Sequence, residues 1–199
     1  MRMKNFLSQT EVPWAWALKQ GIRDPYQLHQ WIWKTLPDDP DARRDFLFRS
    51  DVKDSILRIL LLSARVPVSS DVSKWKTTEV SDTFLSHGTY RFQLRANPSF
   101  RRAKDHKRLA IFDEVKIREW FMRKLTSIGC TVSNLETTAP RKILFHKDGD
   151  ARCGTVYSVD ASGILSVDDE SAFRTAFDSG IGPAKGFGFG LLMLQPIQL

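Results

Sequence analysis

The segment from Asp24 to Leu36, DPYQLHQWIWKTL, constrains the fold most, because it predicts a short amphipathic helix that needs an apolar surface to cover. Asp24 is a suitable N-cap, and Pro25 suits the first helical position, where its missing amide hydrogen costs nothing. At about 100° per residue, Leu28, Ile32 and Leu36 fall on one side of this helix. We expect that side to dock on a sheet.

The other side of the same helix carries Tyr26, His29, Gln30 and Trp33. Tyr26 and His29 are three residues apart, so they are neighbours on the helix surface. Histidine is the residue type that both gives and takes a proton near neutral pH. The pair therefore predicts an acid/base site, and the alternative is that His29 is a half-buried structural residue bonded to the backbone.

The rest of the first half indicates strands. Residues 45–50 (DFLFRS) and 56–65 (ILRILLLSAR) predict an antiparallel hairpin, although a helix for the second stays open because a short apolar run does not fix its own period. The polar, threonine-rich stretch 71–84 is typical of an edge strand and its approach. Residues 14–18 fit either a strand or a short helix.

The second half begins with the clearest strand, Tyr90 to Ala96, in which apolar and polar residues alternate. A dense cationic loop is expected over 99–108, and a helix over 113–128. The helix has a predicted buried stripe formed by Ile117, Trp120, Phe121, Leu125 and Ile128. Further expected elements are strands at 131–139, 142–147 and 154–160 with a turn at 148–150, a short helix within 168–178, and a terminal strand at 191–196.

Each half thus follows the order strand, helix, strand pair, helix or loop, strand. This is the β-α-β-β-α-β order of the ferredoxin-like fold. We therefore predict an α+β protein with two tandem ferredoxin-like (RRM-like) domains and antiparallel sheets. The expected domains are 1–87, which carries the Tyr26/His29 helix, and 88–199, which carries the basic strand, the cationic loop and a glycine-rich loop.

The glycine-rich stretch 180–190, GIGPAKGFGFG, lets backbone amides approach an anion. It is not a Walker A loop, because Lys185 is followed by Gly186 and not by Ser or Thr, and the GxGxxG spacing also fails. Residues 185–189, KGFGF, match the opening of the RNA-recognition-motif signature, whose aromatic residues stack on bases. The alternative is a tight glycine turn against a helix.

Charge and composition narrow the function. The formal net charge of +7 favours a polyanionic partner, with nucleic acid first and anionic membrane or acidic protein behind it. Cys130 and Cys153 lack a metal-ligand spacing, and no carboxylate cluster stands out, which favours chemistry without a metal. No apolar run is long enough to span a bilayer, and no signal peptide is evident, so we expect a cytoplasmic protein.

Four segments together resemble the CasE family of CRISPR-associated endoribonucleases from the type I-E Cascade complex. They are DPYQLHQ (24–30), RDFLF (44–48), FQLRANP (92–98) and GIGPAKGFGFGLL (180–192). The last also fits the glycine pattern of the wider RAMP superfamily, G-h-G-x5-G-x-G, through Gly180, Gly182, Gly188 and Gly190.

The resemblance implies tandem ferredoxin-like domains and cleavage of CRISPR precursor RNA at the 3′ base of the repeat stem-loop. It implies no metal and no cofactor: the ribose 2′-hydroxyl attacks its own phosphate and leaves a 2′,3′-cyclic phosphate and a 5′-hydroxyl. The product stays bound in Cascade, whose other subunits, the backbone protein first, are the expected protein partners. The family's catalytic histidine and tyrosine match His29 and Tyr26.

A cation must also balance the charge that builds on the phosphorus, and Lys34 and Lys185 are the candidates. The full set of expected RNA-binding residues is Lys34, Arg91, Arg95, Arg101, Arg102, Lys104, Lys107, Arg108, Lys185 and Gly186. Two alternatives from other classes remain, namely a non-catalytic RNA-hairpin-binding module and a protein-interaction subunit that does not touch RNA.

Overall fold

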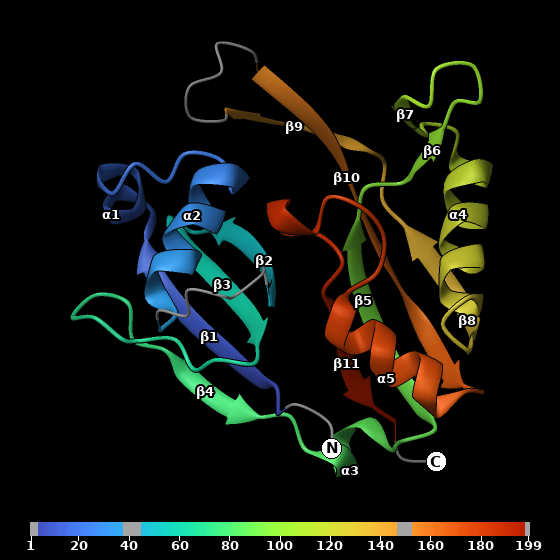
Figure 1. Cartoon of the computed structure of the whole chain (residues 1–199), viewed down its shortest axis with the longest axis horizontal. Coiled ribbons are helices and arrows are strands. Elements are labelled where there is room, and N and C mark those ends of the chain that lie inside the picture. The colour runs from blue at the N-terminus through green and yellow to red at the C-terminus, as the bar shows by residue number, and fades with distance from the viewer. Residues whose placement is uncertain (1–3, 38–44, 147–152, 198–199) are drawn as a thin grey trace. The chain divides into compact units, whose positions relative to one another are not determined.

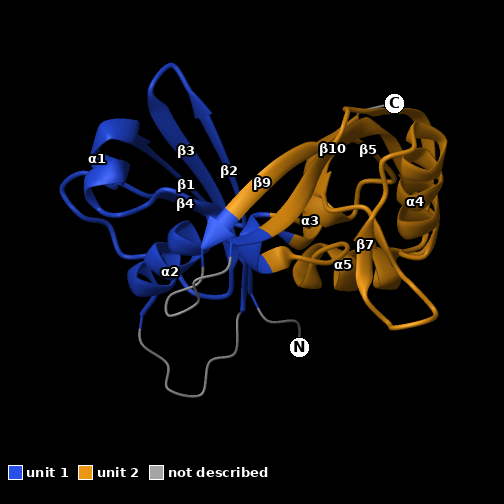
Figure 2. Ribbon diagram, turned by 90° about the horizontal axis from the view of Figure 1, so that it is seen from above, with its two compact units in different colours: residues 1–81, 145–154, 186–188 blue, residues 82–144, 155–185, 189–199 orange. Residues whose placement is uncertain are grey.

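The computed structural model describes residues 4–37, 45–146 and 153–197, and the chain in it divides into two compact units. Unit 1 consists of residues 1–81, 145–154 and 186–188, and unit 2 of residues 82–144, 155–185 and 189–199 (Figure 2). The first division falls after Ser81, six residues before the expected boundary. Arg174 accounts for this, because its guanidinium binds the Asp82 carboxylate at 2.7 Å and the Ser86 hydroxyl at 2.8 Å, both within unit 2.

Unit 1 contains one sheet with antiparallel neighbours in the order β2-β3-β1-β4 (Figure 1). This is the ferredoxin-like strand order, with coil over residues 64–75 in the place of a second helix. The elements are β1 (Phe6–Pro13), α1 (Trp14–Lys19), α2 (Pro25–Thr35), β2 (Phe46–Lys53), β3 (Ile56–Ser63) and β4 (Lys76–Glu79).

Helix α2 forms as predicted. The Asp24 carboxylate accepts hydrogen bonds from the backbone N–H groups of Tyr26 (2.9 Å) and Gln27 (3.0 Å), which confirms the N-cap. Leu28, Ile32 and Leu36 are buried in one apolar cluster with residues of β2 and β3, so the expected apolar side does cover the sheet.

The β2–β3 hairpin and the edge position of β4 are confirmed, and the helical alternative for 56–65 is wrong. Residues 14–18 form a helix, α1. Strand β1 was not predicted. Its inward side carries Ser8, Thr10 and Val12, which are 0%, 2% and 0% exposed, so two of the three core positions of this strand are polar and do not mark a buried face in the sequence.

The second half of the chain contains a sheet in the order β11-β5-β10-β8, with β9 paired to β10. The order is again ferredoxin-like, and helices α4 and α5 stand in the two helix positions (Figure 1). The elements are α3 (Asp82–Leu85), β5 (Thr89–Ala96), β6 (Ser99–Arg101), β7 (Arg108–Ala110), α4 (Glu114–Thr126), β8 (Cys130–Thr137), β9 (Arg141–His146), β10 (Cys153–Val167), α5 (Glu170–Ser179), the 3-10 turn η1 (Lys185–Phe187) and β11 (Leu192–Pro196).

Strand β5 alternates between buried and exposed residues as predicted, and four of the five stripe residues of α4 are buried, while Ile128 is half-buried beyond the helix end. The short helix and the terminal strand are confirmed as α5 and β11. The turn expected at 148–150 lies outside the described residues. In the described part of the chain, no helix is long and apolar enough to cross a membrane.

Two expectations for this half need correction. The cationic segment 99–108 is not a loop throughout, because β6 and β7 pair as a two-stranded ribbon; we call residues 99–110 the cationic ribbon. Strand β10 continues to Val167 and does not end at 160. Gly163 permits this, since a Cβ there would lie 2.9 Å from the Ser133 carbonyl oxygen of β8, at the point where the register shifts.

Candidate active site

The predicted acid/base pair lies on α2 in unit 1, and both Tyr26 and His29 are half-buried. The His29 imidazole stacks on Phe46, with ring centroids 5.1 Å apart and an interplanar angle of 27°. Trp33 and Phe48 lie beside it at 6.1 and 6.3 Å. We call Trp33, Phe46 and Phe48 the aromatic cluster; it fixes the plane of the imidazole.

The His29 imidazole is only partly exposed to solvent. The Nδ1 atom is buried, whereas the residue as a whole is half-buried, so its solvent-exposed part lies elsewhere than at Nδ1. The imidazole is therefore neither sealed in the core nor fully solvated. Phe46 and Phe48 both contact the imidazole ring because they are two residues apart on β2 and so face the same side of the sheet.

The glycine-rich stretch contributes directly to unit 1. Gly188 has a φ of +83°, and a Cβ on it would lie 3.1 Å from the Phe48 ring. Phe187 packs on Phe145 with ring centroids 4.2 Å apart. Segment 186–188 therefore lies against the aromatic cluster, one ring away from His29.

The base-stacking platform that the sequence left open at 185–189 cannot include Phe189. Residues Lys185–Phe187 form a 3-10 turn, not a strand, and Phe189 is 0% exposed. A ring that is fully buried offers no face to a base. The glycines instead serve close packing and left-handed turns, which is the alternative that the sequence left open.

The two candidate cations occupy different settings. Lys34 is exposed on α2, but five residues at about 100° each place it roughly 140° around the helix from His29. The Lys185 ammonium donates to the backbone carbonyl of Ser179, the last residue of α5, at 2.7 Å. Gly186 is half-buried in unit 1.

Two of the predicted RNA-binding arginines are engaged in ion pairs. Arg95 forms two hydrogen bonds to Asp160, at 2.8 and 3.0 Å, and its side chain is 12% exposed. Arg102 forms two to Asp105, at 2.9 and 2.5 Å. This contact raises the pKa of Arg102 and lowers the pKa of Asp105. Both charges are thus largely compensated locally.

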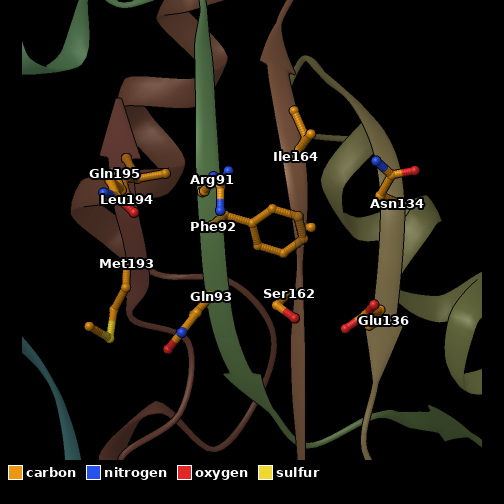
Figure 3. A pocket seen from close by; sticks show the side chains of 11 residues that line it. Arg91, Phe92, Gln93, Asn134, Glu136, Ser162, Ile164, Met193, Leu194 and Gln195 are labelled. Carbon is orange, nitrogen blue, oxygen red and sulfur yellow. The ribbon is translucent and has the colours of Figure 1, made fainter. Parts of the chain in front are cut away.

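The remaining basic residues of the set lie on exposed positions of unit 2. Arg91 lines a hollow of about 620 Å³ on the second sheet, and Figure 3 shows the lining side chains distributed along β5, β8, β10 and β11. Glu136 also lines it, so the hollow is not strongly cationic. The cationic ribbon carries Arg101, Lys104, Lys107 and Arg108, all of them exposed.

One contact beside the site was not predicted. Oδ2 of Asp24 accepts a hydrogen bond from the backbone N–H of His146 at 2.9 Å. No local pattern in the sequence links residues that are 122 positions apart. Among the residues that the structure describes, no group of three His, Cys, Asp or Glu side chains could hold a metal ion.

Comparison with known proteins agrees with this architecture. The chain matches the family model for "CRISPR associated protein" over residues 6–196. It is 34% identical over 206 residues to the CRISPR system Cascade subunit CasE of Escherichia coli K12, an alignment that covers 96% of this chain and 100% of the relative.

Solved structures agree as well. The crystal structure of the CRISPR-associated protein Cas6e from E. coli K-12 is 31% identical, with a TM-score of 0.75 and coverage of 96% of this chain and 100% of that one. Thermus thermophilus Cse3, bound to an RNA representing a pre-cleavage complex, has a TM-score of 0.82 at 20% identity, covers 97% and 100%, and shares the fold. The expected α+β class with tandem ferredoxin-like units is confirmed.

The two ferredoxin-like units and the family match define the chain as a CRISPR-associated protein. More narrowly, it belongs to the CasE family of the type I-E Cascade complex, because the identity to CasE extends over nearly the whole of both chains.

Proposed function

We propose that this protein is an endoribonuclease that processes CRISPR precursor RNA and then remains with the product as a Cascade subunit. The observation that carries the proposal is the Tyr26/His29 pair on α2, with the His29 imidazole set on the aromatic cluster and segment 186–188 against that cluster. The named activity of the relatives, CRISPR-associated endoribonuclease, supports it. With RNA as substrate, we place the protein in the cytoplasm.

The proposed reaction needs no metal. The ribose 2′-oxygen forms a bond to the adjacent phosphorus, the bond from phosphorus to the 5′-oxygen breaks, and a proton moves from the 2′-hydroxyl to the leaving oxygen. His29 either accepts the proton of the 2′-hydroxyl or donates a proton to the leaving oxygen, and because Nδ1 is buried we assign this transfer to Nε2. Tyr26 orients the phosphate or the attacking group, and Lys34 and Lys185 are the candidates for stabilising the extra negative charge.

We further propose that the stem is held at its phosphates by the exposed cations of the cationic ribbon. A-form RNA hides its base edges in a deep major groove, so a stem is recognised largely by shape and by its backbone. Arg101, Lys104 and Arg108 are exposed, whereas Arg95 and Arg102 are ion-paired and the Lys107 ammonium lies 3.9 Å from the Asp105 carboxylate. We expect Arg101, Lys104 and Arg108 to contribute more to RNA binding than the paired residues.

The test is cleavage of a CRISPR repeat hairpin in EDTA at saturating protein. His29→Ala should slow single-turnover cleavage by about 100-fold or more, with RNA affinity retained. Tyr26→Phe keeps the ring but removes the hydroxyl, and should slow cleavage by about tenfold. His87→Ala, a histidine of unit 2, is the matched control and should cleave at the wild-type rate.

The product ends distinguish the alternatives. A 3′ end that resists phosphatase until acid opens a cyclic phosphate supports the proposed reaction. Tight binding of an RNA that stays intact would instead identify a non-catalytic hairpin-binding module. Equal loss of affinity and rate in His29→Ala would assign that residue a folding role.

A further inference from the structure

The Asp24 carboxylate joins two elements of unit 1 that are far apart in the sequence. Oδ1 accepts from the first-turn amides of α2, and Oδ2 accepts from the backbone N–H of His146 at 2.9 Å, with the Nδ1 atom of His146 at 3.5 Å. The Asp24 side chain is only 9% exposed, whereas that of His146 is 64% exposed. One nearly buried carboxylate thus ties the start of α2 to the end of β9.

The end of the β9–β10 pair has a second attachment in unit 1. A Cβ on Gly154 would lie 2.2 Å from Cζ of Phe145, so only glycine lets this ring lie on the backbone of β10. Phe145 in turn packs on Phe187, and Gly188 packs on the aromatic cluster. The same strand end is therefore connected directly to the first turn of α2 and, through segment 186–188, to Phe48 of β2, whose ring centroid lies 6.3 Å from that of His29.

We propose that Asp24 is a positioning residue for the cleavage reaction, and that its bond to the His146 amide, which we call the Asp24 latch, holds the first turn of α2 in its reactive place. This inference rests on the proposed function of Tyr26 and His29. Tyr26 is the residue most directly held, because its own N–H binds the same carboxylate.

Hydrogen bonds to a charged acceptor are roughly twice as strong as neutral ones. The first turn of a helix is also where backbone groups lack intrahelical partners and fraying begins. Displacement of a reacting group by about 1 Å lowers a rate by about 100-fold. Loss of the latch should therefore lower the rate of cleavage far more than the affinity for RNA.

The variant Asp24→Asn removes the Asp24 latch but keeps the N-cap of α2. Asparagine is as good an N-cap as aspartate, and its carbonyl oxygen keeps the contacts to the first-turn amides. The other half of its side chain becomes an NH2 group, which cannot accept from the His146 N–H. Asp169→Asn is the matched control: Asp169 caps α5 in unit 2 by accepting from the Ala172 N–H at 3.0 Å.

We expect Asp24→Asn to slow single-turnover cleavage by about 10- to 100-fold, with the RNA dissociation constant within about threefold of wild type. Asp169→Asn should leave the cleavage rate unchanged. His146→Ala should also cleave at close to the wild-type rate, because the latch uses the backbone amide and alanine retains it. In the free protein, amide hydrogen exchange over 141–146 should be faster in Asp24→Asn.

Faster exchange with an unchanged cleavage rate would overturn the positioning role, and unchanged exchange would overturn the latch itself. Equal loss of cleavage in Asp24→Asn and Asp169→Asn would reduce the effect to general helix stability. If Asp24→Asn does not fold, Asp24→Ser keeps a capping oxygen on a side chain too short to reach His146, and the same outcomes apply. The exchange measurement needs no RNA, so it stands even if His29→Ala proves fully active and the proposed function fails.

Discussion

Alanine at Gly188 tests whether the glycine-rich segment supports the imidazole of His29. Gly188 has a φ of +83°, and the left-handed conformation costs an L-residue about 1–2 kcal/mol. The new methyl group would also lie 3.1 Å from the Phe48 ring, and such overpacking costs about 1–3 kcal/mol. Together these terms predict a loss of about 2–5 kcal/mol in the free energy of unfolding.

Gly21 provides the matched control within unit 1. Its φ of +78° is nearly the same, but a Cβ there would meet nothing within 4 Å. Gly21→Ala should therefore lose only the backbone part, about 1–2 kcal/mol. For a chain of this size 1 kcal/mol corresponds to about 2–4 °C, so the melting temperature should fall by about 2–8 °C in Gly21→Ala and clearly further in Gly188→Ala.

Thermal unfolding and single-turnover cleavage, measured on both variants, complete the test. Gly188→Ala should also slow cleavage, because Phe48 is part of the aromatic cluster on which the His29 ring rests, whereas Gly21→Ala should not. Equal losses of melting temperature in the two variants would refute the contact with Phe48. A large loss of melting temperature with full cleavage activity would refute the link from that contact to His29.

Two further predictions follow from the charges and thiols. The double variant Arg101→Ala/Lys104→Ala should weaken hairpin binding and reduce the salt dependence of the affinity. Each lost phosphate contact should lower the slope of log affinity against log salt concentration by about 0.7–0.9. Arg102→Ala should have a smaller effect, because the charge of Arg102 is paired with Asp105. Iodoacetamide at pH 8 should modify the exposed Cys153 and spare Cys130, since burial raises the pKa of Cys130 to about 12. Mass spectrometry identifies the modified cysteine, and rapid labelling of Cys130 in the folded protein would contradict this reasoning.

Local patterns in the sequence predicted an element correctly where the periodicity of apolar residues and a capping residue indicate the same helix or strand. Asp24 and Pro25 mark the start of α2, and Leu28 and Ile32 mark its buried side, so both the helix and the orientation of the Tyr26/His29 pair follow from spacing. The alternation in Thr89–Ala96 likewise determines β5. In each case the local preference agrees with the burial that the fold imposes.

The incorrect or missing predictions concern segments whose structure is set by contacts with residues far away in the sequence. Strand β1 buries Ser8 and Thr10, and only its pairing with β3 and β4 makes these residues part of a core. Phe189 belongs to a segment resembling an RNA-binding signature, yet it is fully buried. The Asp24–His146 bond spans 122 residues, and neither residue type suggests the other.

The ion pairs of the basic residues could not be predicted from the sequence either. Arg95 and Asp160 lie on different strands, and only the antiparallel register of β5 and β10 places them opposite each other. An arginine count overstates the charge that is available to RNA, because such pairs become visible only once the register is known.

The discontinuous make-up of unit 1 limits how the protein can be divided. A fragment ending at residue 81 would contain α2 and its sheet but not residues 145–154 or 186–188. Asp24 would lose its distant amide and Phe48 the glycine packed on it. Exchanging N-terminal halves between relatives would therefore produce chimaeras in which α2 depends on two short pieces inherited from the other parent. These pieces would have to be transplanted together with it.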